Sequence, residues 1–221
     1  MLELFLILLA GNLASLASWL LKIPVGTGWV QALLAAGIYF LVIFRGRPLL
    51  LAGQKTPDGI YRKVGLALGT GLGLTLPPIA FFIFPVLVSS IDYTPIKNLS
   101  LAALLFRLLA EIPFLTALCE ELLFRHYLFE KFKARGFIKT VLLNSLIFTL
   151  WHIVVVLRTV LDTNLSQSAF LTGLAYLGGL ASVFVGGFVF GWVRHQTGSF
   201  LYSALTHWLN VALMGLVIWL L

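Results

Sequence analysis

The stretch 107–131, RLLAEIPFLTALCEELLFRHYLFEK, governs how the rest of the chain is interpreted. It is mostly apolar and long enough to cross a bilayer. It nevertheless contains five charged side chains before the Glu130 and Lys131 that end it. They are Arg107, Glu111, Glu120, Glu121 and Arg125. An ionisable group at bilayer depth costs on the order of a few kcal/mol, so each is expected to have a partner or a function.

Helical spacing gives four of these five groups a local partner. Arg107 and Glu111 are four residues apart, and so are Glu121 and Arg125. Side chains four residues apart lie on one helical face and can neutralise each other. Glu120 is the carboxylate that remains without a local partner, so the sequence question is what Glu120 meets.

The composition is that of a membrane protein. The chain has 221 residues, of which 60% are hydrophobic and 10% are charged, whereas a soluble domain has about a quarter charged residues. The net charge of +7 is therefore assigned to membrane topology, and no nucleic-acid partner is expected. The single cysteine, Cys119, excludes an internal disulfide and a cysteine-based zinc cluster. The apolar run 2–21 lacks a basic segment before it and is interpreted as a retained span.

The predicted fold is an all-α, polytopic transmembrane helix bundle with about seven spans. The apolar segments are 2–21, 28–44, 64–90, 100–130, 138–158, 168–193 and 200–221. Pro77 and Pro78 interrupt the third, which is then kinked or divided into two, giving eight spans. Residues 1–99 are expected to form N-terminal membrane helices and residues 100–221 the transmembrane core of the chain.

Lysine and arginine set the predicted orientation. With seven spans, ten of these residues fall in loops on one side, against Lys22, Lys97 and Arg158 on the other. The richer side is expected to be cytoplasmic, which places the N-terminus in the cytoplasm. Because the chain is compact, we expect the inner membrane of a prokaryotic cell. Two runs of small residues predict close helix packing, Gly65, Gly69 and Gly73 in one and Gly187 and Gly191 in the other.

Two histidines inside later spans are candidates to meet Glu120. At 1.5 Å per residue, Glu120, His152 and His207 lie about 15, 20 and 12 Å from the cytoplasmic ends of their segments. All three therefore fall at overlapping depths in the cytoplasmic half. Asn210 follows His207 by nearly one turn and lies on the same face.

These residue types together suit hydrolysis. A carboxylate and an imidazole can take a proton from water and pass it to a leaving group. A second imidazole and an amide can donate to an oxyanion. Taken alone, His152 is equally well explained as a donor in helix packing. Glu121 and Arg125 favour a structural pair beside Glu120, and Phe148 is expected to pack so that it positions His152.

The order of three motifs resembles a known family. EELLFR at 120–125, FTLWH at 148–152 and His207 with Asn210 are similar to the motifs of the CPBP family of intramembrane glutamic proteases. These are the CAAX-protease and bacteriocin-processing (Abi) proteins, which include the type II CAAX prenyl endopeptidases. The resemblance covers residues 107–214 and implies that the transmembrane core over residues 100–221 is catalytic. The family often has glycine after the motif arginine, where this chain has His126.

The resemblance implies roles for individual residues. Glu120 is similar to the general base that activates water together with His152. His207 is similar to an oxyanion donor, with an asparagine as the second donor, and no metal or cofactor is implied. The family asparagine follows the histidine by four residues, where this chain has Val211, and Asn210 stands one position earlier. Asn210 can replace it only if the helix is rotated or locally distorted. Membrane lipid and a peptide or membrane-protein substrate are the implied partners.

Two other functions remain open at this stage. Glu120, His152 and His207 could instead hold zinc in a catalytic site, although the chain has no HExxH motif. The chain could also be a non-catalytic scaffold, an immunity protein or a transporter accessory, because a fold does not guarantee activity. The sequence leaves the substrate and the oligomeric state open.

Overall fold

The computed structural model describes residues 2–21, 33–42, 44, 59–83 and 93–220. The regular secondary structure in these ranges is helical. Within these ranges there is no strand, only an isolated bridge between Tyr93 and Thr163. The all-α prediction is confirmed. The elements are α1 (Leu2–Leu20), a helix over Leu33–Val42, α3 (Ile60–Ile83), α5 (Thr94–Lys97), one continuous helix over Leu101–Arg135, α9 (Phe137–Trp151), α10 (Ile153–Leu161), the 3-10 turn η4 (Asn164–Gln167), α11 (Ala169–Thr197) and α12 (Phe200–Leu220).

Several of these helices are suited to a bilayer, so this is an integral membrane protein. Among the described residues, three helices are long and apolar enough to cross it: Leu101–Arg135, Ala169–Thr197 and Phe200–Leu220. A fourth span results if the bent pair α9 and α10 is counted as one, and the helices over Leu4–Leu20 and Leu33–Val42 are shorter but apolar. The count of seven or eight spans stays a prediction, because parts of the segments 28–44 and 64–90 lie outside the described residues. α3 itself is a single helix through Pro77 and Pro78.

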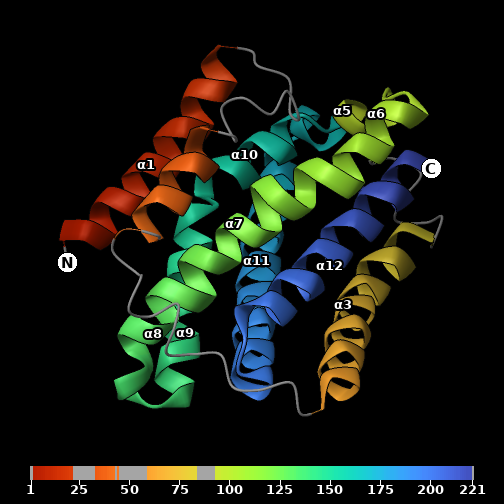
Figure 1. Cartoon of the computed structure of the whole chain (residues 1–221). Helices are drawn as coiled ribbons and strands as arrows, with labels where there is room; N and C mark the ends of the chain where they lie inside the picture. The colour runs from red at the N-terminus through yellow and green to blue at the C-terminus, as the bar shows by residue number, and fades with distance from the viewer. Residues whose placement is uncertain (1, 22–32, 43, 45–58, 84–92, 221) are drawn as a thin grey trace.

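The helix over Leu101–Arg135 is the central element of the bundle. It comprises α6 (Leu101–Phe106), η1 (Arg107–Ala117), α7 (Leu118–Glu121), η2 (Leu122–Leu128), α8 (Phe129–Phe132) and η3 (Lys133–Arg135). Ser100 caps its beginning by accepting a hydrogen bond from the Ala103 N–H. Figure 1 shows it crossing the bundle, with α1 towards one side and α12 and α3 towards the other. It ends at Gly136, whose φ of +86° suits glycine.

Two parts of this central helix are π-helical, η1 and η2. Pro113 lies inside η1 and has no N–H to donate, while its carbonyl accepts from the Leu118 N–H, five residues further on. The short α-helical piece α7, which carries Glu120 and Glu121, lies between the two wider segments. π-helical turns are frequent at functional sites, and here they flank the two adjacent carboxylates.

α11 approaches α9 closely at the two expected glycines. A Cβ on Gly187 would lie 3.2 Å from the Ser145 Cα, and one on Gly191 would lie 3.1 Å from Val141 Cγ1. A larger residue at either position would push the helices apart. The close packing predicted from this glycine pair is confirmed.

The glycines of α3 behave differently. A Cβ on Gly71 would lie 3.1 Å from the Thr206 carbonyl oxygen of α12. Cβ atoms on Gly65, Gly69 and Gly73 would meet nothing within 4 Å among the described residues. The close contact therefore uses Gly71, and the prediction that the other three mediate packing is wrong within the described part of the chain.

The segment 138–158, expected as one span, is bent. α9 and α10 meet at an angle of 48°, and the residue between them is His152, with φ −95° and ψ 1°. The hydrophobic pattern continues through this position, so the pattern did not reveal the break. The bend places His152 where it can leave the regular helical surface and turn towards the central helix.

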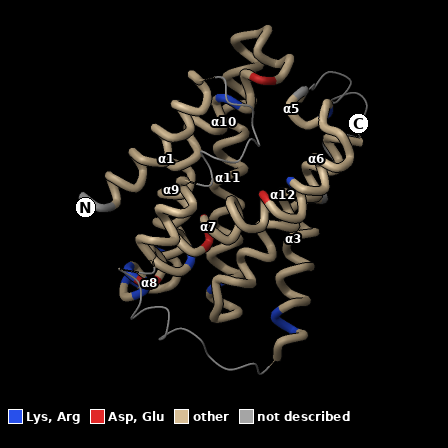
Figure 2. Tube along the Cα trace, turned by 45° about the horizontal axis from the view of Figure 1, so that its top comes forward, with Lys and Arg blue, Asp and Glu red and all other residues tan. Residues whose placement is uncertain are grey.

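Figure 2 shows where charge lies along the molecule. Lysine and arginine occur near α8 and at the beginning of α3, and few charged residues lie in the middle of the bundle. Residues 45–58, which contain several of the basic residues counted in the orientation argument, lie outside the described residues. The cytoplasmic orientation of this end therefore stays a prediction.

Candidate active site

Glu120 meets His152. The Glu120 Oε2 and His152 Nε2 atoms are 3.7 Å apart, and the two side chains keep 13% and 15% of their surface exposed. This separation is too long for a direct hydrogen bond. It suits a single water molecule that contacts both atoms. The carboxylate that had no partner on its own helix thus faces an imidazole from a distant one.

The proton on His152 can be assigned from its other neighbour. The Nδ1 atom lies 2.8 Å from the Phe148 carbonyl oxygen. Because a carbonyl oxygen only accepts, Nδ1 must carry a proton, and in the neutral ring Nε2 then presents its lone pair towards Glu120. The Phe148 ring also packs against the imidazole, with ring centroids 4.4 Å apart. Phe148 therefore contacts His152 through both its backbone and its side chain.

The neighbouring ion pair, Glu121 with Arg125, is fully buried. Arg125 Nη1 lies 3.1 Å from Glu121 Oε1, and both side chains are 0% exposed. Arg125 Nη2 also donates to the Gly187 carbonyl at 3.0 Å, and its guanidinium lies 4.2 Å from the Phe148 ring centroid. The predicted Glu121–Arg125 pair is confirmed. The two adjacent carboxylates differ in exposure, since the Glu120 side chain keeps a small exposed fraction and the Glu121 side chain keeps none.

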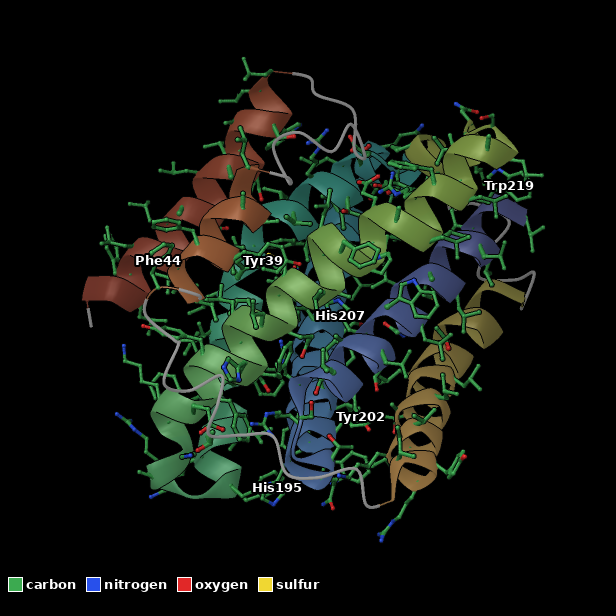
Figure 3. The ribbon with its side chains drawn as sticks, in the orientation of Figure 1. Tyr39, Phe44, His195, Tyr202, His207 and Trp219 are labelled. Carbon is green, nitrogen blue, oxygen red and sulfur yellow. The ribbon has the colours of Figure 1, made fainter. Side chains whose placement is uncertain are left out.

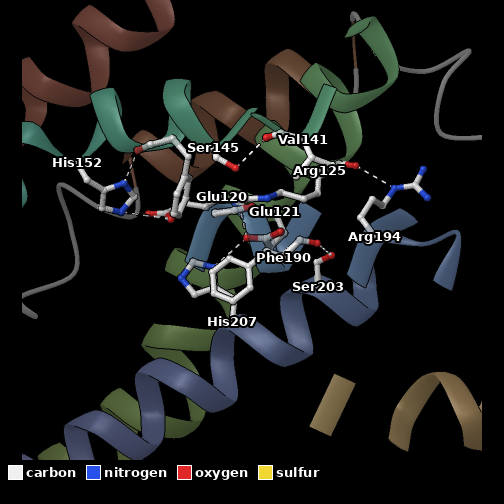
Figure 4. A network of polar contacts seen from close by, with 12 residues as sticks. Glu120, Glu121, Arg125, Val141, Ser145, His152, Phe190, Arg194, Ser203 and His207 are labelled. Carbon is white, nitrogen blue, oxygen red and sulfur yellow. Dashed lines mark hydrogen bonds and ion pairs between the residues drawn. The ribbon is translucent and has the colours of Figure 1, made fainter. Parts of the chain in front are cut away.

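The second imidazole, His207, is held by Glu121. Its Nδ1 atom lies 3.0 Å from Glu121 Oε1, and the Phe190 ring stacks on it with centroids 4.6 Å apart. Figure 4 shows His207 and Arg125 converging on the same carboxylate, with His152 and Glu120 beside them. Figure 3 shows His207 on α12 near the central helix. The sequence did not reveal this contact, because adjacent residues on a helix point about 100° apart and spacing cannot decide which carboxylate faces α12.

One cavity connects these groups. It has a volume of about 420 Å³, and its lining includes Glu120, His152 and His207. Arg107 and Glu111, the other pair of the central helix, also line it. The predicted acid and the two imidazoles are therefore brought together.

Asn210 differs from the other predicted site residues. Val211 is one of the described residues that line the cavity, whereas Asn210 is not. This matches the position at which the asparagine of the motif is expected, four residues after His207. The role of Asn210 as a donor stays a prediction.

The sequence also missed Arg194. Arg194 is one of the ten basic residues expected in loops on the cytoplasmic side, but it lies within α11 and is buried. Its Nε donates to the Arg125 carbonyl at 3.0 Å, and its Nη2 lies 2.9 Å from Glu130 Oε1. Lys133 also contacts Glu130. Arg194 thus attaches α11 to the central helix at the Arg125 carbonyl and at the Glu130 side chain.

The donor set does not suit the zinc alternative. Zinc would require Glu120, His152 and His207 to converge on one point. Within the described ranges, no group of three His, Cys, Asp or Glu side chains is placed to hold a metal ion. Instead, His207 directs Nδ1 at Glu121.

These features define a helical integral membrane protein with a carboxylate–imidazole cavity. Residues 98–213, just over half of the chain, match the family model described as Type II CAAX prenyl endopeptidase Rce1-like. The chain belongs to this family, which implies a CAAX-type membrane protease. Comparisons with curated proteins and with solved structures find no match. The matched region contains Glu120, His152 and His207, whereas α1, the helix over Leu33–Val42 and α3 lie outside it.

Proposed function

We propose that the protein is an intramembrane endopeptidase in which Glu120 and His152 activate the water that attacks a peptide bond. The observation that carries this proposal is the 3.7 Å approach of Glu120 Oε2 and His152 Nε2 at the wall of a cavity, with both side chains partly exposed. The adjacent Glu121 and Arg125 are fully sealed. Only one carboxylate of the adjacent pair is therefore in a position to handle water.

The proposed reaction begins with one water molecule between the two groups. It donates one hydrogen towards Glu120 and the other towards the lone pair of His152 Nε2. As its oxygen attacks the peptide carbonyl carbon, Glu120 accepts a proton, and the carboxylic acid then delivers it to the departing amine. Atoms balance because the water supplies the hydroxyl of the new carboxyl group and the proton of the new amine.

His207 is the proposed donor to the oxyanion that forms in this step. Its Nδ1 faces the Glu121 carboxylate, so Nε2 can donate only if the ring carries both protons. The charges of protonated His207 and Arg125 would then balance those of Glu120 and Glu121. Asn210 remains the proposed second donor, which requires a local rotation of α12 because Val211 occupies the cavity wall.

An apolar groove beside the cavity is the proposed site for the apolar part of the substrate. The groove has a volume of about 640 Å³, and it shares Leu34, Ile38 and Trp151 with the catalytic cavity. Its remaining lining residues are Leu6, Ile7, Ala10, Leu33, Gly37, Leu41 and Leu123. A prenyl chain or an apolar peptide segment could lie there while the scissile bond reaches Glu120. The cavity is proposed to face the cytoplasmic half of the membrane, as the distribution of Lys and Arg suggests.

Filling this groove is expected to weaken substrate binding. A Cβ on Gly37 would meet nothing within 4 Å, so Gly37→Leu should extend into the groove without disturbing the helix. We expect KM for a prenylated peptide to rise about tenfold or more, with kcat nearly unchanged, since a mismatch of a single methylene group in a hydrophobic pocket already costs about tenfold and the leucine side chain is larger than that. Gly65→Leu is the matched control, because its Cβ is equally free and it lies outside the groove. An equal KM in the two variants would argue against this substrate site.

The activity itself is tested with purified protein in lipid nanodiscs, given prenylated and unmodified peptides in the presence of a strong chelator. We expect cleavage to persist, because water is activated by a carboxylate and an imidazole. Cleavage that stops and returns with added zinc would favour the metalloprotease alternative. A wild-type protein that cleaves no peptide in a broad screen would favour the non-catalytic alternative.

A further inference from the structure

At the break between α9 and α10, a side chain from α1 binds the backbone groups that a helical hydrogen bond would otherwise join. In an unbroken α-helix the Leu150 carbonyl would accept from the Val154 N–H, four residues further on. Here the amide of Asn12 binds both groups. Its Nδ2 donates to the Leu150 oxygen at 3.0 Å, and its Oδ1 accepts from the Val154 N–H at 3.3 Å. Asn12 thus replaces the helical hydrogen bond between Leu150 and Val154, which would span His152.

The amide of Asn12 has no freedom to turn. Its Nδ2 also donates to the Leu8 carbonyl of its own helix at 3.0 Å. Both amide hydrogens therefore point to carbonyls, and the oxygen points to an N–H, so a flipped amide would lose all three contacts. A helix is bent in this way when a side chain inserts into its hydrogen-bond ladder.

The preceding residue shows how closely α1 lies against the break. A Cβ on Gly11 would lie 2.4 Å from two atoms of the Trp151 ring, a distance at which something must move. Gly11 and Asn12 thus contact the two residues that precede His152 and the second residue that follows it. Figure 1 shows α1 running beside α10. α1 lies outside the residues matched by the family model.

From this geometry we infer that Asn12 is a positioning residue that fixes the helix break and so directs His152 at Glu120. The inference rests on the proposed function. Backbone polar groups left unpaired in a bilayer are costly, so without Asn12 the Leu150 carbonyl and Val154 N–H gain by binding each other. That would straighten the helix and turn the His152 ring away, since one residue of helix is about 100° of rotation.

Three variants test this role. Asn12→Leu removes both contacts at similar volume, and Asn12→Asp keeps the acceptor for Val154 but loses the donor to Leu150. Leu8→Ala, which weakens packing of α1 against the core without touching the break, is the control for helix docking. We expect kcat to fall about 10- to 100-fold in Asn12→Leu, the range produced by a misplacement of about 1 Å, with KM within about twofold. Asn12→Asp should fall between Asn12→Leu and wild type.

A second measurement does not depend on activity. The ¹⁵N resonances of the His152 ring, assigned with His152→Gln, should report an Nδ1–H tautomer in wild type and in Leu8→Ala, and should change in both Asn12 variants. Unchanged His152 resonances, or a kcat loss no larger than in Leu8→Ala, would overturn the inference. If Asn12→Leu does not fold, Asn12→Asp decides by the same criteria. If wild type cleaves nothing, the proposed function fails, while the resonances still decide the role of Asn12.

Discussion

Glu120→Gln is expected to lower kcat by about 10²- to 10⁴-fold, the contribution usual for a general base, in a protein that folds normally. Glutamine has nearly the shape of glutamate but cannot take the proton from the water held against His152. Because Glu120 is partly exposed in the cavity and lies 3.7 Å from His152, removal of its charge should leave the neighbouring sealed pair in place. The rate is measured with a fluorogenic peptide in nanodiscs.

The control for this prediction is Asp162→Asn, which removes a carboxylate that pairs with Arg158 and does not line the cavity. His152→Gln should cause a loss of similar order to Glu120→Gln. The double variant should lose little more than either single variant, because residues that act as one unit are strongly non-additive. Wild-type kcat in Glu120→Gln would contradict the role of this residue. Fully additive losses would show that the two groups act separately.

Arg125→Met is expected to destabilise the protein by about 3–5 kcal/mol, the usual cost of breaking a buried ion pair by removing one partner, because Glu121 then keeps His207 in place of two partners. Arg125 and Glu121 are both 0% exposed and 3.1 Å apart. The variant would also remove the donor to the Gly187 carbonyl and the guanidinium that lies over Phe148. The single buried thiol, Cys119, is a direct reporter, because a thiol-reactive dye labels it as the helices separate on heating.

Two variants make this stability test specific. Glu121→Gln combined with Arg125→Met should recover part of the loss, since both members of the buried ion pair are then neutral. Lys133→Met, which removes the exposed lysine paired with Glu130, should cost less than about 1 kcal/mol. A double variant less stable than Arg125→Met would contradict the account of this pair.

Hydrophobic patterning was enough to outline the helices but did not reveal their breaks. The segments 2–21, 168–193 and 200–221 correspond closely to α1, α11 and α12. The break at His152 could not be predicted, because it depends on the Asn12 side chain from a helix 140 positions earlier in the sequence. Apolar residues continue on both sides of the break, and periodicity does not report where a backbone hydrogen bond is replaced.

The site was partly predictable, because a charged side chain in an apolar helix is costly unless it has a partner or a function. That reasoning identified Glu120 as the group in need of a partner and paired Glu121 with Arg125. It did not show that His207 binds Glu121, because this depends on the rotation of α12 against the central helix. It also missed the buried Arg194, since an arginine near the end of a span is equally compatible with solvent.

The central claim is that Glu120 and His152 deliver a water molecule directly to the peptide carbonyl. Its most direct test is a single turnover in ¹⁸O-labelled water, with excess wild-type protein over a prenylated peptide and with Glu120→Gln in parallel. The account predicts one ¹⁸O atom in the new carboxyl group within that turnover, no peptide attached to the protein at any time, and almost no product from Glu120→Gln. A covalent peptide–protein adduct, or equal product formation by the variant, would contradict it.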